Sequence, residues 1–268
     1  MASKDTYDFD VTVCLPGVRV EAWVPLYESI KWSANNCSFE LIIVGPHPPP
    51  PVLSQEPNIT YIQDYGCPSR CVQIASLASR GKLFTFVSDD GILRPFSLEG
   101  AVKSFDTEMM VMRYTEGINR QGGIHSQPDE YWNAWHHADL QKECLRGYLI
   151  APVWMMETSR FKHLGGLDCR FEHINVCCQD LAFRIQANGG KLKLSPDFVM
   201  DCDWSSRGSC SVVDAYVEND KPLLDSICDS SKNPFENRMR IDYNNWLASP
   251  PLWPRRFAAN ELNNDYRY

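Results

Sequence analysis

The 268-residue sequence lacks any apolar run of the roughly 18–20 residues that a membrane-spanning helix requires. Its first ten residues are polar, so they also lack the apolar middle section of a secretory signal peptide. We therefore expect no membrane span and a cytoplasmic location, with peripheral attachment to a membrane left open.

Positive charge is also in short supply. Lys and Arg number 26 against 34 Asp and Glu, which gives a net charge of −8. Because a nucleic-acid backbone is bound by clustered positive charge, this balance argues against a nucleic-acid partner. Small phosphorylated ligands stay possible, since a metal ion can supply the missing charge.

The cysteines lack the pairing expected of a disulfide scaffold or a zinc site. There are 11 of them, an odd number, and no two have the C-x-x-C spacing. Without a secretory signal, this count favours reduced thiols, and it argues against structural zinc.

What the sequence does contain is a series of short apolar, β-branched segments that alternate with helical patterns. Strands are predicted at residues 10–15, 39–44, 59–62, 82–87, 148–156 and 192–194, and helices at 23–32, 71–79 and 180–187. Residues 116–146 read as irregular or partly helical. This alternation predicts an α/β fold with a central, mostly parallel sheet flanked by helices. We expect a catalytic domain over 1–204 and a C-terminal extension, 205–268, packed on it.

Two adjacent carboxylates, Asp89 and Asp90, follow the fourth predicted strand directly, after Ser88. Ligands of parallel α/β sheets bind beyond the carboxyl ends of strands, so this loop lies where chemistry is expected. Hard divalent cations are held by one or two carboxylates when phosphates supply further oxygens. The alternative is a plain polar turn, because Asp and Gly are common in turns.

A second motif reads R-x-x-x-x-G-G-x-D-x-x-F-E from Arg160 to Glu172, and an acidic position, Asp180, precedes R-I-x-x-x-G. In this order, after the strand and the Asp89–Asp90 loop, the motifs resemble family 2 glycosyltransferases of the GT-A fold, the nucleotide-diphospho-sugar transferase type. The resemblance covers roughly residues 10–200, and its specificity lies in the ordered combination.

The resemblance implies a metal-dependent hexosyl- or pentosyltransferase that moves a sugar from a nucleotide-diphosphate donor to a hydroxyl acceptor such as a glycan, with inversion. The metal, Mn²⁺ or Mg²⁺, would bridge the donor phosphates and take up charge on the leaving group. The residue roles it implies are the general base (Asp180), metal ligands (Asp90, Asp89 and Asp203), donor contacts (Pro16, Arg70, Ser88 and Asp89) and acceptor contacts (Asp168, Glu172 and Trp154).

The sequence departs from the family pattern at three places. The second strand ends in Gly45-Pro46, where the family has acidic residues. The usual position of the base falls on Cys177 or Cys178, which leaves Asp180 as the favoured base. A late histidine ligand is replaced by Asp201 or Asp203.

Two other functions remain open. A catalytically inactive nucleotide-sugar or carbohydrate-binding module would explain the altered positions. A sugar nucleotidyltransferase is disfavoured, because it needs a Gly-rich phosphate loop and residues 15–19 offer one Gly and one Arg.

Overall fold

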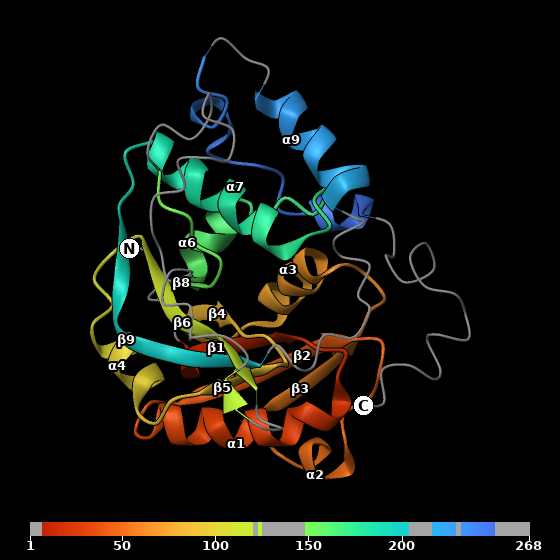
Figure 1. Cartoon of the computed structure of the whole chain (residues 1–268), viewed down its shortest axis with the longest axis vertical. Helices are drawn as coiled ribbons and strands as arrows, with labels where there is room; N and C mark the ends of the chain where they lie inside the picture. Colours follow the sequence, from red (N-terminus) through yellow and green to blue (C-terminus); the bar gives the residue numbers. More distant parts are fainter. Residues whose placement is uncertain (1–6, 120–122, 125–147, 204–215, 229–231, 250–268) are drawn as a thin grey trace.

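The computed structural model describes residues 7–119, 123–124, 148–203, 216–228 and 232–249. Nine strands in this part of the chain form one sheet (Figure 1). Eight run in the order β3-β2-β1-β4-β8-β6-β9-β5, and β7 pairs with β6. Their bounds are β1 Phe9–Pro16, β2 Phe39–Gly45, β3 Ile59–Gln63, β4 Gly81–Phe86, β5 Gly91–Leu93, β6 Met109–Asn119, β7 Gly123–Ile124, β8 Trp154–Glu157 and β9 Leu192–Asp203.

Helices cover both faces of the sheet (Figure 1). One face carries α1 (Trp23–Ala34), which follows the short turn η1 (Val20–Ala22), together with α2 (Pro51–Ser54) and α4 (Ser97–Lys103). The other carries α3 (Pro68–Ala78), α6 (Thr158–His163) and α7 (Ile174–Ala187). After β9, the chain continues with η4 (Tyr216–Asp220), α9 (Lys221–Cys228), η5 (Glu236–Arg238) and η6 (Asn245–Ala248).

The two faces bury separate apolar clusters because side chains alternate along a strand. In β1, Val13 and Leu15 pack with α1, whereas Cys14 packs on the side of α3. In β2, Ile43 joins the α1 side and Ile42 the α3 side. A strand buried on both faces needs a continuous apolar run, which is the pattern that identified these strands in the sequence.

The structure confirms the α/β fold class, but the sheet is mixed rather than mostly parallel. β1 pairs in parallel with β2 and β4, β2 with β3, and β6 with β9. The pairs β4–β8, β5–β9, β6–β7 and β6–β8 are antiparallel. The parallel half therefore contains the strands predicted from the N-terminal sequence, and the antiparallel pairings involve strands that the pattern placed poorly.

Four predicted segments have wrong boundaries. The strand expected at 148–156 is the shorter β8, and the start of the region expected to be irregular or helical belongs to β6. The short strand at 192–194 is the beginning of the 12-residue β9, whose register against β6 shifts near Pro196. Helix α7 begins at Ile174 instead of 180, because the His173 side chain caps it by accepting a hydrogen bond from the Asn175 N–H (3.2 Å).

All nine cysteines in the described part of the chain are reduced, and eight of them are buried. This agrees with the expectation from their odd number and irregular spacing. Across the same residues, no helix has both the length and the apolar character that crossing a membrane demands.

Candidate active site

The first group of candidate residues lies where the neighbouring parallel strands β1 and β4 end. Pro16 is the last residue of β1, and Ser88, Asp89 and Asp90 follow β4. The Val87 N–H donates to the Cys14 carbonyl (2.9 Å), so the β4 segment stays paired with β1 up to this loop. Chain topology therefore brings residues 16–19 and 88–90 together.

Asp89 holds these two loops to each other. Its Oδ2 accepts hydrogen bonds from the backbone N–H groups of Val18 (2.9 Å) and Arg19 (2.8 Å). Its Oδ1 lies 2.9 Å from Nη2 of Arg19. Burial raises the pKa of Asp89 above its ordinary value, and the charge of Arg19 opposes that rise. With both oxygens occupied and only 2% of the residue exposed, Asp89 orders the loop after β1.

Asp90 is the more accessible carboxylate, with 20% of its side chain exposed. Its Oδ1 accepts a hydrogen bond from the Ser88 hydroxyl, and its Oδ2 lies 3.4 Å from Nη1 of Arg19. Arg19 thus contacts both adjacent carboxylates through its two terminal nitrogens. In the sequence, Arg19 was noted only as the single Arg of residues 15–19, which lack a Gly-rich phosphate loop. Its place in the loop after the first predicted strand, close to Gly17, is the feature that could have marked it as a site residue.

Gly45 explains one departure from the family pattern. The Gly17 N–H donates to the Val44 carbonyl (3.0 Å), which extends the pairing of β1 and β2 past Pro16. A Cβ on residue 45 would lie 2.0 Å from the Gly17 carbonyl oxygen, so a side chain there would push the loop away. The missing acidic side chain is therefore the consequence of a close backbone approach.

Arg70, expected at a donor phosphate, contacts other groups of the protein in this structure. Its guanidinium pairs with Asp64 (Nε–Oδ1 2.9 Å), and Nη1 donates to the carbonyls of Trp246 (2.6 Å) and Ser249 (2.7 Å). It also lies over the Trp246 ring, 5.3 Å from the ring centroid. In this structure Arg70 fastens the segment around η6 to α3.

Two further candidates, Asp168 and Asp180, are buried and belong to a charge cluster with the buried Arg184, the partly exposed Arg238 and the exposed Arg170. Arg238 joins its two carboxylates, with Nη2 2.6 Å from Asp168 Oδ2 and Nη1 2.8 Å from Asp180 Oδ1. Burial would raise the pKa of Asp168, but hydrogen bonds and charge from Arg170 and Arg238 hold that pKa below its ordinary value. Arg238 lies 58 residues from Asp180 along the chain, and no sequence pattern pointed to it.

Asp180 does not have the surroundings of a general base. It is 1% exposed; Oδ2 accepts from Arg184 Nε (2.8 Å) and Oδ1 from Arg238. A base must reach the proton that it removes, and this carboxylate is enclosed by two guanidinium groups. The structure therefore argues against the expected role. Cys177 and Cys178, at the usual position of the base, are buried in the apolar cluster on the α3 side.

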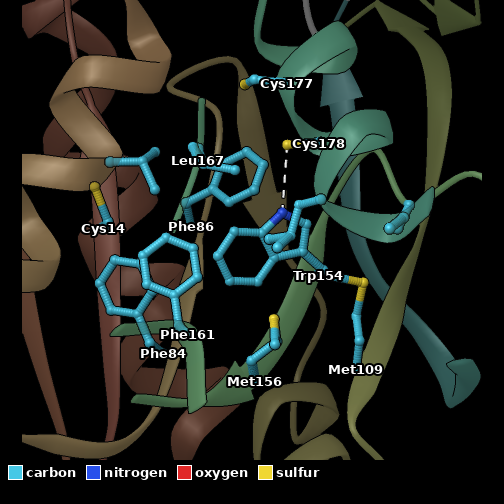
Figure 2. Packing of buried hydrophobic residues seen from close by; sticks show 14 of the residues in the cluster. Cys14, Phe84, Phe86, Met109, Trp154, Met156, Phe161, Leu167, Cys177 and Cys178 are labelled. Atoms are coloured by element: carbon cyan, nitrogen blue, oxygen red, sulfur yellow. Dashed lines mark hydrogen bonds between the residues drawn. The ribbon is translucent and has the colours of Figure 1, made fainter. Parts of the chain in front are cut away.

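Trp154, predicted to contact the acceptor, lies in the core of this structure. Figure 2 shows its ring among Phe84, Phe161 and Met156, with the indole N–H directed at Cys178. The ring centroid is 5.0 Å from that of Phe161 in a stacked arrangement, and the Nε1–Sγ distance to Cys178 is 3.3 Å. Trp154 is 0% exposed, so it presents no ring face to a sugar.

Glu172 is buried beside a residue that the sequence did not single out, Asp220. The carboxylate of Asp220 accepts from the backbone N–H groups of Glu172 (2.8 Å) and His173 (2.7 Å). Asp220, the last residue of η4, therefore fixes the chain where it enters α7. Because its bonds go to backbone N–H groups, no residue pattern in the sequence marks them.

The aspartates expected to bind a metal differ in how many carboxylate oxygens they could offer to it. Asp89 does not fit, because both of its oxygens are used within the protein. Asp90 fits as a single carboxylate ligand. Asp201 accepts from Arg94 (2.9 Å) and Thr115, and the side chain of Asp203, the last residue of β9, lies outside what is described. Within the described ranges, no three His, Cys, Asp or Glu side chains form a metal-binding group.

Comparison with known proteins identifies the fold. No protein-family model and no curated protein matches the chain. The crystal structure of S. aureus TarS residues 1–349 matches with a TM-score of 0.56 at 13% identity, covering 88% of this chain and 71% of that one. The same fragment in complex with UDP-GlcNAc gives 0.54 at 12% identity, covering 94% and 76%. A crystal structure of S. aureus TarS that extends beyond this fragment gives 0.55 at 12% identity, with 94% of this chain but only 46% of that chain covered.

At these identities the similarity establishes the architecture. The chain has the α/β fold of the GT-A type that the resemblance of its motifs implied, with a central sheet flanked by helices.

Proposed function

We propose that this chain is a glycosyltransferase that moves a sugar from a nucleotide-diphosphate sugar to a hydroxyl acceptor such as a glycan. The observation that carries the proposal is the meeting of Arg19, Asp89 and Asp90 at the carboxyl ends of β1 and β4. Ligands of open α/β sheets bind at this edge. A TarS structure of the same architecture was solved with UDP-GlcNAc, which makes that nucleotide-sugar the first donor to test.

On the donor side, Pro16 and Ser88 frame the two loops that approach the nucleotide, and Asp89 sets their separation. Mn²⁺ or Mg²⁺ would be held by Asp90, and this ion supplies positive charge beside the leaving diphosphate. Arg70 contributes indirectly, because it fastens the C-terminal segment next to α3.

On the acceptor side, Asp168 and Glu172 contribute by positioning neighbouring residues and the chain around them. Asp168 orients Arg170 and Arg238, and the backbone of Glu172 is held by Asp220. The proposal includes inversion at the anomeric carbon, which is supported by the resemblance of the ordered motifs to family 2 glycosyltransferases.

One observation favours a second function, a nucleotide-sugar-binding module without turnover. The position where the family has its base holds the buried thiols Cys177 and Cys178, and Asp180 is enclosed by Arg184 and Arg238. A module of this kind would bind the donor and release it unchanged.

The test is a thermal-shift screen of nucleotide-sugars, UDP-GlcNAc first, each with and without Mn²⁺ or Mg²⁺. A ligand at 100 times its Kd stabilises the folded state by about 2.7 kcal/mol. For a chain of this size that corresponds to a rise in Tm of roughly 5–10 °C. Asp89→Asn should remove the shift, because it loosens the loop after β1. Asp106→Asn, which changes an exposed ion pair with Lys193 in the same chemical way, should retain it.

A shift followed by consumption of the donor in the presence of hydroxyl acceptors supports the transferase. A shift without consumption supports the binding module. No shift for any nucleotide-sugar in wild-type protein would refute both functions.

A further inference from the structure

Arg19 lies where its charge acts on both carboxylates of the proposed site, Asp89 and Asp90. The inference drawn from this position rests on the proposed function. Its two terminal nitrogens lie against Asp89 (2.9 Å) and Asp90 (3.4 Å). The backbone N–H of the same residue donates to Asp89 (2.8 Å), so backbone and side chain are fastened to one carboxylate. The side chain nevertheless keeps 20% of its surface exposed.

The contact with Asp90 has a consequence for a divalent cation. Asp90 is the accessible carboxylate of the pair, and its Oδ2 faces a guanidinium that already carries a full positive charge. A cation at the same oxygen would be repelled at short range, where protein surroundings screen charges poorly. Arg19 and the cation therefore compete for Asp90.

The contact with Asp89 differs, because two backbone N–H groups remain on that carboxylate whatever the Arg19 side chain does. The bond from the Arg19 N–H to Asp89 would therefore keep the Arg19 backbone in place if the guanidinium turned to another partner. A planar guanidinium binds phosphate oxygens in a two-pronged geometry that an ammonium lacks.

We propose that Arg19 is a donor-phosphate ligand that also masks Asp90 from divalent cations, so that diphosphate binding draws the guanidinium off Asp90 and opens that carboxylate to the metal. Nucleotide and cation then bind with positive coupling. Each improves the affinity of the other by the same factor, as linkage between two sites requires.

The experiment measures two affinities in wild-type protein and in four variants: Mn²⁺ alone, followed by electron paramagnetic resonance, and UDP with Mn²⁺, followed by calorimetry. Arg19→Gln keeps a side-chain donor for Asp89 but removes the charge, and it should bind Mn²⁺ about tenfold more tightly and UDP about tenfold more weakly. Arg19→Lys keeps the charge but loses the planar fork, so Mn²⁺ affinity should stay near wild type while UDP affinity falls.

Two controls identify the site. Asp90→Asn should abolish Mn²⁺ binding, so that the signal of the free ion keeps its full intensity, which places the bound ion at Asp90. Arg80→Ala, which removes a half-exposed arginine paired with Asp8 and Glu40, should change neither affinity. Melting temperatures of all variants verify folding.

Tighter Mn²⁺ binding together with weaker UDP binding in Arg19→Gln supports the inference, because loss of a merely structural residue would weaken the binding of both. Unchanged or weaker Mn²⁺ binding in Arg19→Gln, or Mn²⁺ binding that survives Asp90→Asn, would overturn it. Since the Mn²⁺ titration needs no nucleotide, it is judged separately from the proposed function, which fails if wild-type protein binds no nucleotide or nucleotide-sugar.

Discussion

The charge cluster around Asp180 allows the expected base role to be separated from a structural one. Asp180→Asn preserves shape but removes the negative charge that faces Arg184, which is 0% exposed, and Arg238. Removing one partner of a buried ion pair costs about 3–5 kcal/mol, because the remaining charge stays buried without compensation. The retained amide oxygen still accepts one hydrogen bond, so we expect a loss of roughly 3 kcal/mol, the lower end of that range.

The assay is urea unfolding followed by circular dichroism at pH 7. The matched control is Glu108→Gln, which makes the same chemical change in the partly exposed pair of Glu108 with Arg160. Exposed pairs contribute about 0–1 kcal/mol, so this variant should lose less than about 1 kcal/mol. If Asp180→Asn is as stable as the control and has lost only turnover, the structural reasoning is refuted and Asp180 is the base.

Two further predictions concern the same region. Gly166→Ala should cost about 2 kcal/mol or more in urea unfolding, because residue 166 has φ +69° and its Cβ would lie 2.1 Å from Oε1 of buried Gln73. Gly100→Ala, in α4 with no atom within 4 Å of the new Cβ, should instead stabilise by up to about 1 kcal/mol; equal losses in the two variants would contradict this argument. The lowered pKa of Asp168 predicts a stabilisation that is complete above its unfolded value of about 3.9 and is lost as pH falls through the folded value. The stability difference between wild type and Asp168→Asn, from urea unfolding, should therefore shrink from pH 7 to pH 3, and a pH-independent difference would show that charge is not its cause.

The sequence predicted the parallel half of the sheet well, for a local reason. β1, β2 and β4 are short, largely apolar runs, as strands buried on both faces must be, so composition alone marks them. β6 and β9 were missed or shortened because their pairing, with register shifts between them, is fixed by distant partners. The start of α7 was placed late because a histidine caps it instead of one of the usual N-cap residues.

The candidate site divides in the same way. Position after an apolar strand was enough to select Asp89 and Asp90, since the ends of parallel strands meet at one edge. That position could not show that Asp89 is enclosed by hydrogen bonds whereas Asp90 stays accessible. These environments depend on two backbone N–H groups and a guanidinium supplied by the loop after β1, about 70 residues earlier in the chain.

The sequence by itself thus determined the α/β class and the loop that carries the paired carboxylates, because these follow from hydrophobic period and residue order. The GT-A type was implied by the resemblance of its ordered motifs to a known family. Only the tertiary structure decided that Trp154 is core, that Asp180 is enclosed, and that Arg19 and Arg238 contact the carboxylates. The physical reason is that burial and ion pairing are properties of what surrounds a side chain, and the partners here lie tens of residues away along the chain.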